Sequence, residues 1–217
     1  MRPKKVLIFS LAYYPFVGGA EVALKEITDR ISPDGVEFHM VTLRFDKKLP
    51  KLEKLGNVLV HRIGFVKLNP SMADLKKFPL HLNKYIFQFL ALIKAILLHR
   101  KYSYDGIWAM LAHSSGIPAG LFKTFYKNVF YILTLQEGDP PKYIERKARL
   151  VWTLFVRGFR LADFLIGEST FLLKWGRKMG FNGESAVVPN GVDVEKFKTQ
   201  IEKRKINELR RDLKIQE

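Results

Sequence analysis

Short runs of adjacent apolar residues alternate along the chain with longer stretches in which apolar residues recur every three or four positions. The segment 4–11 predicts a buried strand, because neighbouring rather than alternating positions are apolar. Residues 20–31 have apolar side chains at spacings of four, three and four, which predicts a helix that Ser32 and Pro33 end. The same patterns predict strands over 36–43, 58–63, 104–110, 129–135, 164–167 and 186–188, and helices over 79–99, 115–126, 142–161 and 169–179.

This alternation of strands and helices predicts an α/β fold. We expect a single Rossmann-like domain with a parallel, doubly wound sheet of about seven strands and helices on both faces. No internal repeat, low-complexity tract or Pro/Gly-rich linker divides the chain. The domain is predicted over residues 1–197, and a helical tail over 198–217, with Ile206, Leu209 and Leu213 on one stripe.

Composition narrows the chemistry that the chain can carry. Hydrophobic residues make up 47% of the 217 residues, which excludes wholesale disorder. There is no cysteine, so disulfides, thiolate zinc sites and cysteine nucleophiles are excluded. The five histidines lack metal-binding spacing, and we predict no metal site. Lys and Arg outnumber Asp and Glu 37 to 21, and this charge favours an anionic partner: nucleic acid, acidic lipid or a phosphorylated small molecule.

Ligands of an open α/β sheet bind at the carboxyl ends of its strands, so the loops that follow the strands are the first candidates for a binding site. Gly18 and Gly19 follow the first strand and precede a helix. Glycines let the backbone approach an anionic ligand, and a helix N-terminus offers free N–H groups. The loop matches neither the dinucleotide-binding nor the Walker glycine pattern. A turn that serves packing alone is the alternative.

A second loop follows the strand predicted over 129–135 and contains Gln136, Glu137 and Asp139. An amide donates and accepts hydrogen bonds and a carboxylate accepts them, each in fixed directions, which suits sugar hydroxyls. We therefore predict these three as catalytic candidates. A solvated turn that caps the next helix is the alternative.

Two further loops supply candidate binding residues. Asn190 and Asp193 lie in the segment PNGVD after the last predicted strand, where an ordinary Asn-Gly turn is the alternative. His113 follows the strand over 104–110, at the same end of the predicted sheet, and is a candidate to contact a ligand. A helix-capping or structural role is the alternative for this histidine.

Taken together, these segments resemble the N-terminal domain of family 4 glycosyltransferases, which have the GT-B fold. The resemblance lies in PFVGGAE (15–21), YDGIWAM (104–110), LTLQEGDPP (133–141), IGEST (166–170) and VVPNGVDVEKF (187–197). It implies a first domain that holds the acceptor and a second that binds a nucleotide-sugar donor, with transfer that retains the anomeric configuration. The donor is a substrate, so no cofactor is implied.

The resemblance also assigns roles by position. Gly18 and Gly19 would lie against the donor diphosphate or the acceptor, and the loop 190–193 near the domain junction. Gln136 stands where many relatives have a histidine near the reacting centre. Because glutamine cannot titrate, a role as general base is in doubt, and Glu137 and Asp139 are the candidates to compensate.

The hallmarks of a donor domain have no counterpart in the sequence. The resemblance therefore implies a partner, a C-terminal donor-binding domain in cis or as a separate subunit, and little activity for this half alone. A non-catalytic subunit that docks on a membrane and presents the acceptor in a split glycosyltransferase is the alternative.

The excess of basic residues has a second implication. On the helix predicted over 142–161, five cations share a narrow arc, and the helix over 79–99 is apolar nearly all round with lysines at its ends. These patterns predict docking on an anionic membrane. A buried helix with a solvated basic face is the alternative. The five cations are Lys142, Arg146, Arg149, Arg157 and Arg160.

We expect a cytoplasmic protein, peripheral at the inner face of the membrane, with a membrane-associated glycolipid or polysaccharide precursor as acceptor. No segment looks like a secretion signal, and Gln88 and Lys94 interrupt the apolar stretch 85–98 before it reaches the length of a span. Nucleic acid is not expected as a partner, because most aromatic residues lie at apolar positions and not among the basic ones.

Overall fold

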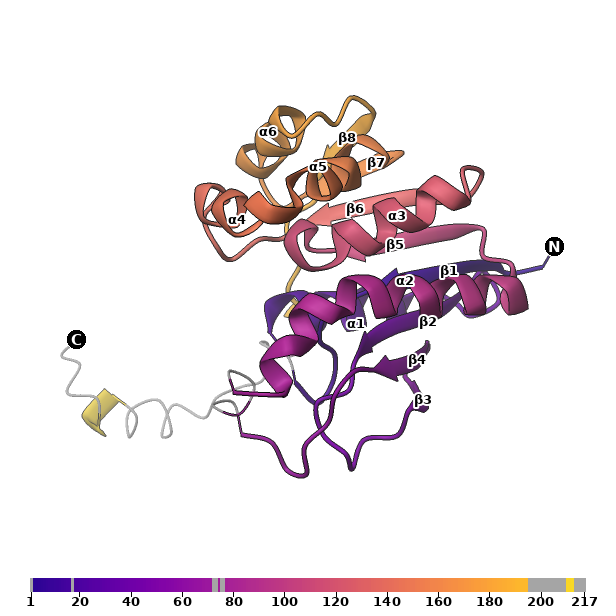
Figure 1. The fold of residues 1–217 in the computed structure, drawn as a ribbon, viewed down its shortest axis with the longest axis vertical. Helices are drawn as coiled ribbons and strands as arrows, with labels where there is room; N and C mark the ends of the chain where they lie inside the picture. Colours follow the sequence, from indigo (N-terminus) through magenta and orange to yellow (C-terminus); the bar gives the residue numbers. More distant parts are fainter. Residues whose placement is uncertain (1, 17, 72–73, 75–76, 195–209, 213–217) are drawn as a thin grey trace.

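The computed structural model describes residues 2–16, 18–71, 74, 77–194 and 210–212. Eight strands form one sheet in the order β3-β4-β2-β1-β5-β6-β7-β8 (Figure 1). All neighbouring strands are parallel except β3 and β4. The strands are β1 (Lys4–Phe9), β2 (Val36–Leu43), β3 (Leu52–Leu55), β4 (Val58–Ile63), β5 (Gly106–Met110), β6 (Phe130–Leu135), β7 (Phe164–Gly167) and β8 (Glu184–Val187).

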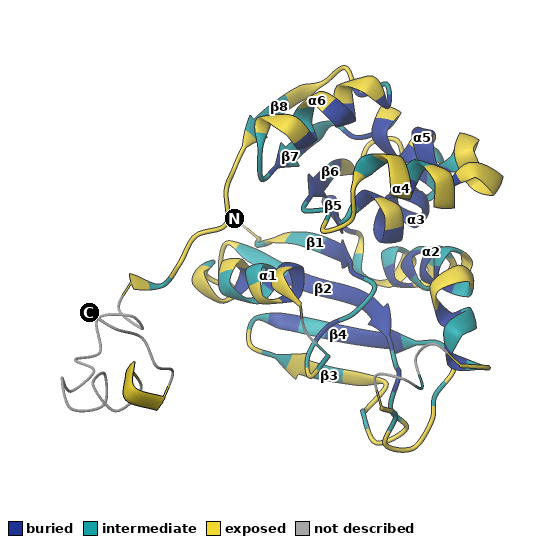
Figure 2. Cartoon of the chain, turned by 90° about the vertical axis from the view of Figure 1, so that its left-hand side faces the viewer, coloured by how far each residue is buried: buried dark blue, intermediate teal, exposed yellow. Residues whose placement is uncertain are grey.

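The helices lie on both faces of this sheet. Figure 2 looks onto the carboxyl ends of the strands, with α1 on one face and α2 with α3 on the other. This confirms the predicted α/β fold with a doubly wound sheet, and β3 is the strand beyond the expected seven. The helices and helical turns are α1 (Gly19–Arg30), η2 (Leu80–Leu82), α2 (Asn83–Tyr102), η3 (Ala112–Gly116), α3 (Ile117–Phe125), α4 (Pro141–Lys147), η4 (Arg149–Val151), α5 (Trp152–Arg160) and α6 (Thr170–Lys178).

Each face of the sheet has its own hydrophobic core, because successive strand residues point to opposite faces. Phe9, Phe87 and Phe122 are fully buried in the core between the sheet and the layer of α2 and α3. Ile8 and Leu24 belong to the second core, beneath α1. Burying one such side chain contributes about 1.5–3 kcal/mol.

Strand β3 was not predicted because it is short and has two adjacent charged residues between its two leucines. It is a short edge strand that joins β4 through a turn at Gly56 and Asn57, where Gly56 has φ +57°. Charged residues on a short edge strand discourage pairing with another chain. The Asn57 side chain donates hydrogen bonds to the carbonyls of Thr28 (3.2 Å) and Ile31 (3.0 Å), and so ties the turn to the end of α1.

The prediction of one continuous helix over 142–161 is wrong. The segment is divided into α4, the short 3-10 turn η4 and α5. No glycine or proline marks the break. Instead, α5 packs so closely on α3 that a Cβ on Gly120 would lie 2.8 Å from the Cα of Gly158, and this contact fixes the direction of α5.

The break also removes the predicted cationic arc. Lys142 and Arg146 lie on α4, Arg149 on η4, and Arg157 and Arg160 on α5. All five are exposed, but they do not share one helical face.

Two further expectations concern the predicted tail over 198–217 and the apolar helix predicted over 79–99. The predicted tail over 198–217 lies outside the described residues except for 210–212, which form a helical turn. One helix of the described part, Leu80–Tyr102, is long and apolar enough by length and composition to cross a membrane, and only 28% of its most apolar window is buried. This is weak evidence for a span, because α2 is also the crossover from β4 to β5 and packs on the sheet.

Candidate functional site

A pocket of about 790 Å³ opens at the carboxyl edge of the sheet. It lies between α1, the ends of β5 to β7 and the segment that follows β8. The wall is largely apolar, with a few polar groups at the strand ends. It is lined by Gly18, Gly19, Val22, Ala23, Glu26, Ile27, Arg30, Trp108, Met110, Thr134, Gln136, Ile166, Glu168, Val188, Pro189, Asn190, Gly191, Val192 and Asp193.

The two glycines that follow β1 form one side of the pocket. Gly18 precedes the first residue of α1, and its backbone N–H donates to the Glu21 carboxylate at 2.6 Å. This closes the first turn of the helix and leaves Gly18 and Gly19 exposed to the pocket. A Cβ on Gly19 would lie 3.9 Å from the side-chain nitrogen of Gln136, so the first and second predicted loops meet here.

The three predicted catalytic residues occupy different surroundings. Gln136 lines the pocket. The Glu137 side chain is fully buried and accepts hydrogen bonds from the Ala112 N–H (2.5 Å) and from Nδ1 of His113 (2.7 Å). Asp139 is half-exposed, 3.9 Å from Nζ of Lys147. Of the three, only Gln136 is placed to contact a ligand in the pocket.

The Glu137 carboxylate therefore positions the side chain of His113. This histidine lies on η3, a π-helical turn that follows Leu111, whose φ of +69° is unusual for a residue with a branched side chain. His113 lies outside the pocket lining. The carbonyl of the next residue, Ser114, accepts a hydrogen bond from Gln88 of α2 at 3.1 Å. The buried carboxylate holds the imidazole at the same sheet edge as Gln136.

The third predicted loop, at 189–193, closes the pocket from the side of β8. Asn190 lines the pocket. Asp193 also lines it and forms an ion pair with Arg30 of α1 at 3.1 Å. This pair holds the segment after β8 against α1, and the structure thus brings all three predicted loops to one pocket.

The described residues contain no group of three or more His, Cys, Asp or Glu side chains that could hold a metal ion.

Comparison with protein-family models identifies the family of this chain. The model of Glycosyltransferase Family 4 matches residues 17–196, which is most of the chain and includes the glycines, Gln136 and the 189–193 segment. This chain belongs to glycosyltransferase family 4. A comparison with curated protein sequences finds no match.

Solved structures agree with the family in their fold. The family 4 domain superposes on sucrose-phosphate synthase from Thermosynechococcus elongatus with a TM-score of 0.61, at 15% identity over 88% of this chain and 49% of that one. An E. coli structure described as trehalose-6-phosphate bound with UDP-2-fluoro glucose gives 0.62, at 16% identity over 97% and 55%. The α,α-trehalose 6-phosphate synthase of Burkholderia multivorans gives 0.60, at 13% identity over 98% and 55%.

The chain thus spans about half the length of these GT-B glycosyltransferases, and its α/β domain corresponds to the N-terminal half of that fold. The predictions of family and fold class are confirmed.

Sequence reasoning missed two groups of the family 4 pocket. Glu168 follows β7 and lines the pocket, and among the described residues its side chain has no hydrogen bond or ion pair. Burial raises the pKa of Glu168 above its usual value. Trp108 donates to the Thr134 hydroxyl at 2.9 Å and lines the pocket. Glu168 lies within the segment IGEST at a strand end, so the rule that selected the other loops could have found it.

Replacing Glu168 by glutamine is expected to stabilise the protein in a pH-dependent way. The folded protein holds the carboxyl proton more tightly than the unfolded chain, so this group favours folding at low pH and loses that contribution as pH rises through its folded pKa. Glutamine has no charge to bury. E168Q is expected to raise Tm at about pH 7.5 and to leave it unchanged at about pH 4. Calorimetry at both pH values measures this, and a lower Tm of the variant at the higher pH would contradict it.

Proposed function

We propose that this family 4 domain is the acceptor-binding half of a retaining glycosyltransferase, which transfers a sugar from a nucleotide-sugar donor to a membrane-associated glycolipid or polysaccharide precursor. One observation carries the proposal: Gly19, Gln136 and Asn190, from three separate loops, line a single pocket at the carboxyl edge of the sheet. That edge is where open α/β sheets bind their ligands.

The pocket offers groups suited to both parts of a nucleotide sugar. The first turn of α1 presents backbone N–H groups and the positive end of the helix dipole, beside glycines that leave room for a phosphate. The Gln136 amide can both donate to and accept from sugar hydroxyls. Glu168, at the end of β7, lines the same pocket and adds a hydrogen-bond acceptor for hydroxyl groups.

Retention is proposed because Gln136 cannot take a proton and Glu137 is buried in two hydrogen bonds. In such a step the bond from the anomeric carbon to the leaving phosphate breaks, and the acceptor oxygen bonds to the same face of that carbon. The acceptor proton passes to the leaving phosphate oxygen, so no protein base is needed. The chain's residues bind and orient both substrates.

The experiment is a transfer assay that supplies the other half of the enzyme. Extract from cells in which this domain alone is deleted, so that the donor-binding half is still made, is incubated with radiolabelled nucleotide sugars, with and without the purified full chain. We expect incorporation of one sugar into a lipid or polysaccharide fraction only when the chain is added. Equal incorporation without it, for every nucleotide sugar tested, would refute the proposal.

A further inference from the structure

Helix α2 presents an apolar stripe to solvent. Tyr85, Phe89, Ile93 and Leu97 recur every four residues and are 62%, 57%, 55% and 56% exposed. Phe78, just before the helix, is 78% exposed. The opposite side of the same helix packs on the sheet through Phe87, Ala91 and Ala95. The helix is therefore a fixed part of the fold, with a second apolar face that no described residue covers.

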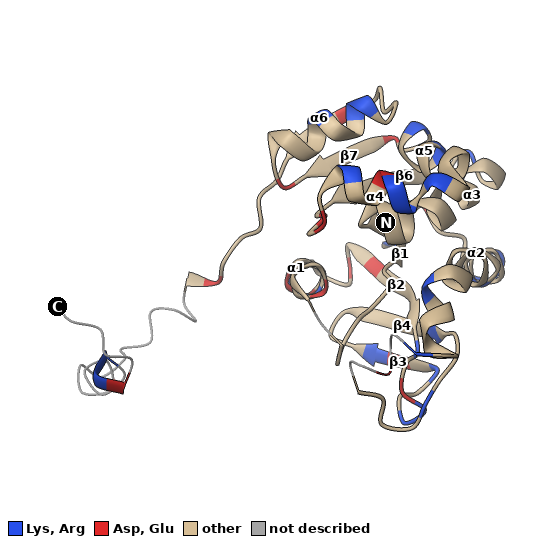
Figure 3. Cartoon of the chain, turned by 60° about the vertical axis from the view of Figure 1, so that its left-hand side comes forward, with Lys and Arg blue, Asp and Glu red and all other residues tan. Residues whose placement is uncertain are grey.

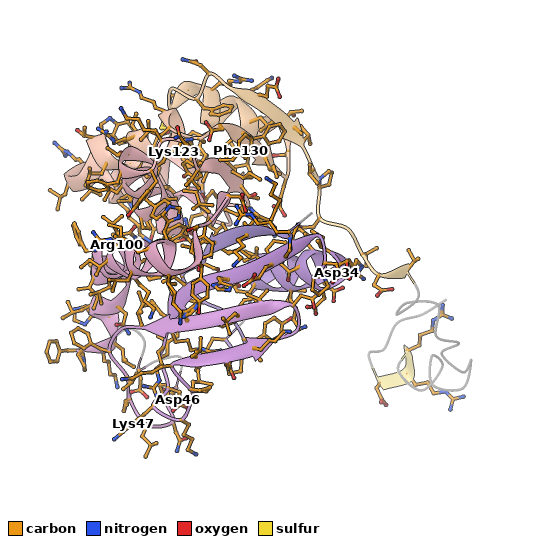
Figure 4. The ribbon with its side chains drawn as sticks, turned by 90° about the vertical axis from the view of Figure 1, so that its right-hand side faces the viewer. Asp34, Asp46, Lys47, Arg100, Lys123 and Phe130 are labelled. Carbon is orange, nitrogen blue, oxygen red and sulfur yellow. The ribbon has the colours of Figure 1, made fainter. Side chains whose placement is uncertain are left out.

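Cations border this stripe. Lys84 lies just before the stripe, Arg100 and Lys101 lie just after it, and all three side chains are exposed. Among the described residues none of them forms an ion pair with a carboxylate; Lys84 lies over the Tyr85 ring at 5.1 Å and Lys101 over the Tyr102 ring at 5.0 Å. Figure 4 shows Arg100 at the outer side of the molecule. Long basic side chains beside exposed aromatic rings are typical of surfaces that rest in a lipid interface.

The helices on the two faces of the sheet differ in their content of acidic and basic residues. Helices α2, α3, α5 and α6 contain no Asp or Glu, while their Lys and Arg residues number four, one, two and three. Helix α1, on the other face, has three acidic and two basic residues. Figure 3 shows red on α1 and blue along the opposite helices. The cations thus accumulate on the face that carries the apolar stripe.

We propose that the outer face of α2 docks this domain on an anionic lipid bilayer. The stripe enters the interface between headgroups and acyl chains, and the cations of α2 meet acidic headgroups. A soluble protein with an acidic and apolar surface would complement this face as well, and vesicle binding distinguishes it from the bilayer. The inference extends the proposed function, because it names the surface on which a lipid-linked acceptor is met.

The position of the stripe fits such an acceptor. Helix α2 leaves from the carboxyl end of β4 and returns to the amino end of β5, so its first turns lie at the pocket edge of the sheet. Gln88, three residues after Tyr85, bonds the η3 turn that carries His113. A bilayer that contacts Tyr85 and Phe89 therefore lies beside the edge where the proposed transfer takes place.

Vesicle flotation of the full chain tests the docking without any donor, acceptor or turnover. We expect binding to vesicles of phosphatidylcholine with phosphatidylglycerol, and much weaker binding to phosphatidylcholine alone. The double variant Phe89→Gln/Ile93→Gln is expected to weaken binding at least about tenfold. Its matched control is Leu52→Gln/Phe171→Gln, whose residues are 53% and 62% exposed on β3 and α6 and whose replacement should leave binding unchanged.

The charges are tested separately. Lys84→Gln/Lys101→Gln is expected to weaken binding to the anionic vesicles about fivefold for each lysine, while Lys51→Gln/Lys54→Gln beside β3 has a much smaller effect. Circular dichroism confirms that each variant is folded. Failure to bind anionic vesicles, equal binding to neutral ones, equal loss in variant and control, or a change of oligomeric state in place of vesicle binding would overturn the proposal. Because no transfer is measured, docking can fail while the transfer assay succeeds, and the reverse.

Discussion

Replacing Gly19 by leucine is expected to reduce sugar transfer by the complete enzyme at least about 100-fold, because displacing a bound substrate by an ångström has a cost of that order. Gly19 is exposed at the start of α1, and a Cβ there would meet nothing closer than the Gln136 side chain at 3.9 Å. The fold therefore tolerates the side chain, which extends into the pocket and occupies the space proposed for the sugar phosphate. The transfer assay described above measures the rate.

A matched control lies at the opposite edge of the sheet. Gly35 is exposed before β2, and a Cβ there would make an ordinary contact at 3.5 Å with the Ser32 carbonyl. Gly35→Leu adds the same apolar side chain away from the pocket and should leave transfer within about twofold of the unchanged protein. An equal loss in both variants would show that leucine acts through folding and not through the pocket.

Replacing Gly158 by valine is expected to destabilise the protein by about 3 kcal/mol or more. A Cβ on Gly158 would lie 2.6 Å from the Gly116 carbonyl oxygen and 2.9 Å from its carbon, and these are backbone atoms that cannot rotate away. The valine forces α5 away from η3 and α3, which opens the core around Phe155 and Phe159. For a chain of this length the loss corresponds to a fall in Tm of about 6–12 °C, measurable by calorimetry.

Gly138→Val provides the comparison. No atom lies within 4 Å of a Cβ on Gly138, and its φ does not require glycine. This variant should change the free energy of unfolding by less than about 0.5 kcal/mol, as is usual for surface positions. If Gly158→Val were as mild as Gly138→Val, the close approach of α3 and α5 would be wrong, and with it our explanation for the break between α4 and α5.

Most of the fold follows from local pattern. Adjacent apolar residues predicted the parallel strands because both faces of those strands are buried, as in Leu7, Ile8 and Phe9. Two features depend on contacts between distant residues. The end of α4 contains no helix-breaking residue, so the α3–α5 packing that bends the chain there is invisible in the local sequence. Strand β3 is half charged and pairs only at the sheet edge.

The sequence predicted which loops meet at the site, but it predicted the directions of their side chains only in part. The rule that ligands bind at strand ends selected Gly19, Gln136 and Asn190, and these do line one pocket. The rule could not tell that the Glu137 side chain turns inward to His113, because neighbouring residues of a loop can point in opposite directions. Likewise, Asp193 pairs with Arg30, a residue 163 positions earlier in the chain.

The most direct test of the proposed role of the pocket in sugar transfer uses the absence of cysteine from the chain. One introduced thiol can therefore be labelled alone. Val192 lines the pocket and is 66% exposed, so Val192→Cys can be alkylated with a bulky maleimide; Lys54→Cys, exposed on β3, is the control. We measure sugar transfer before and after labelling. The account predicts that labelling at 192 abolishes transfer, that nucleotide sugar with acceptor slows the labelling there, and that labelling at 54 changes nothing. Full transfer by the protein labelled at 192 would contradict it.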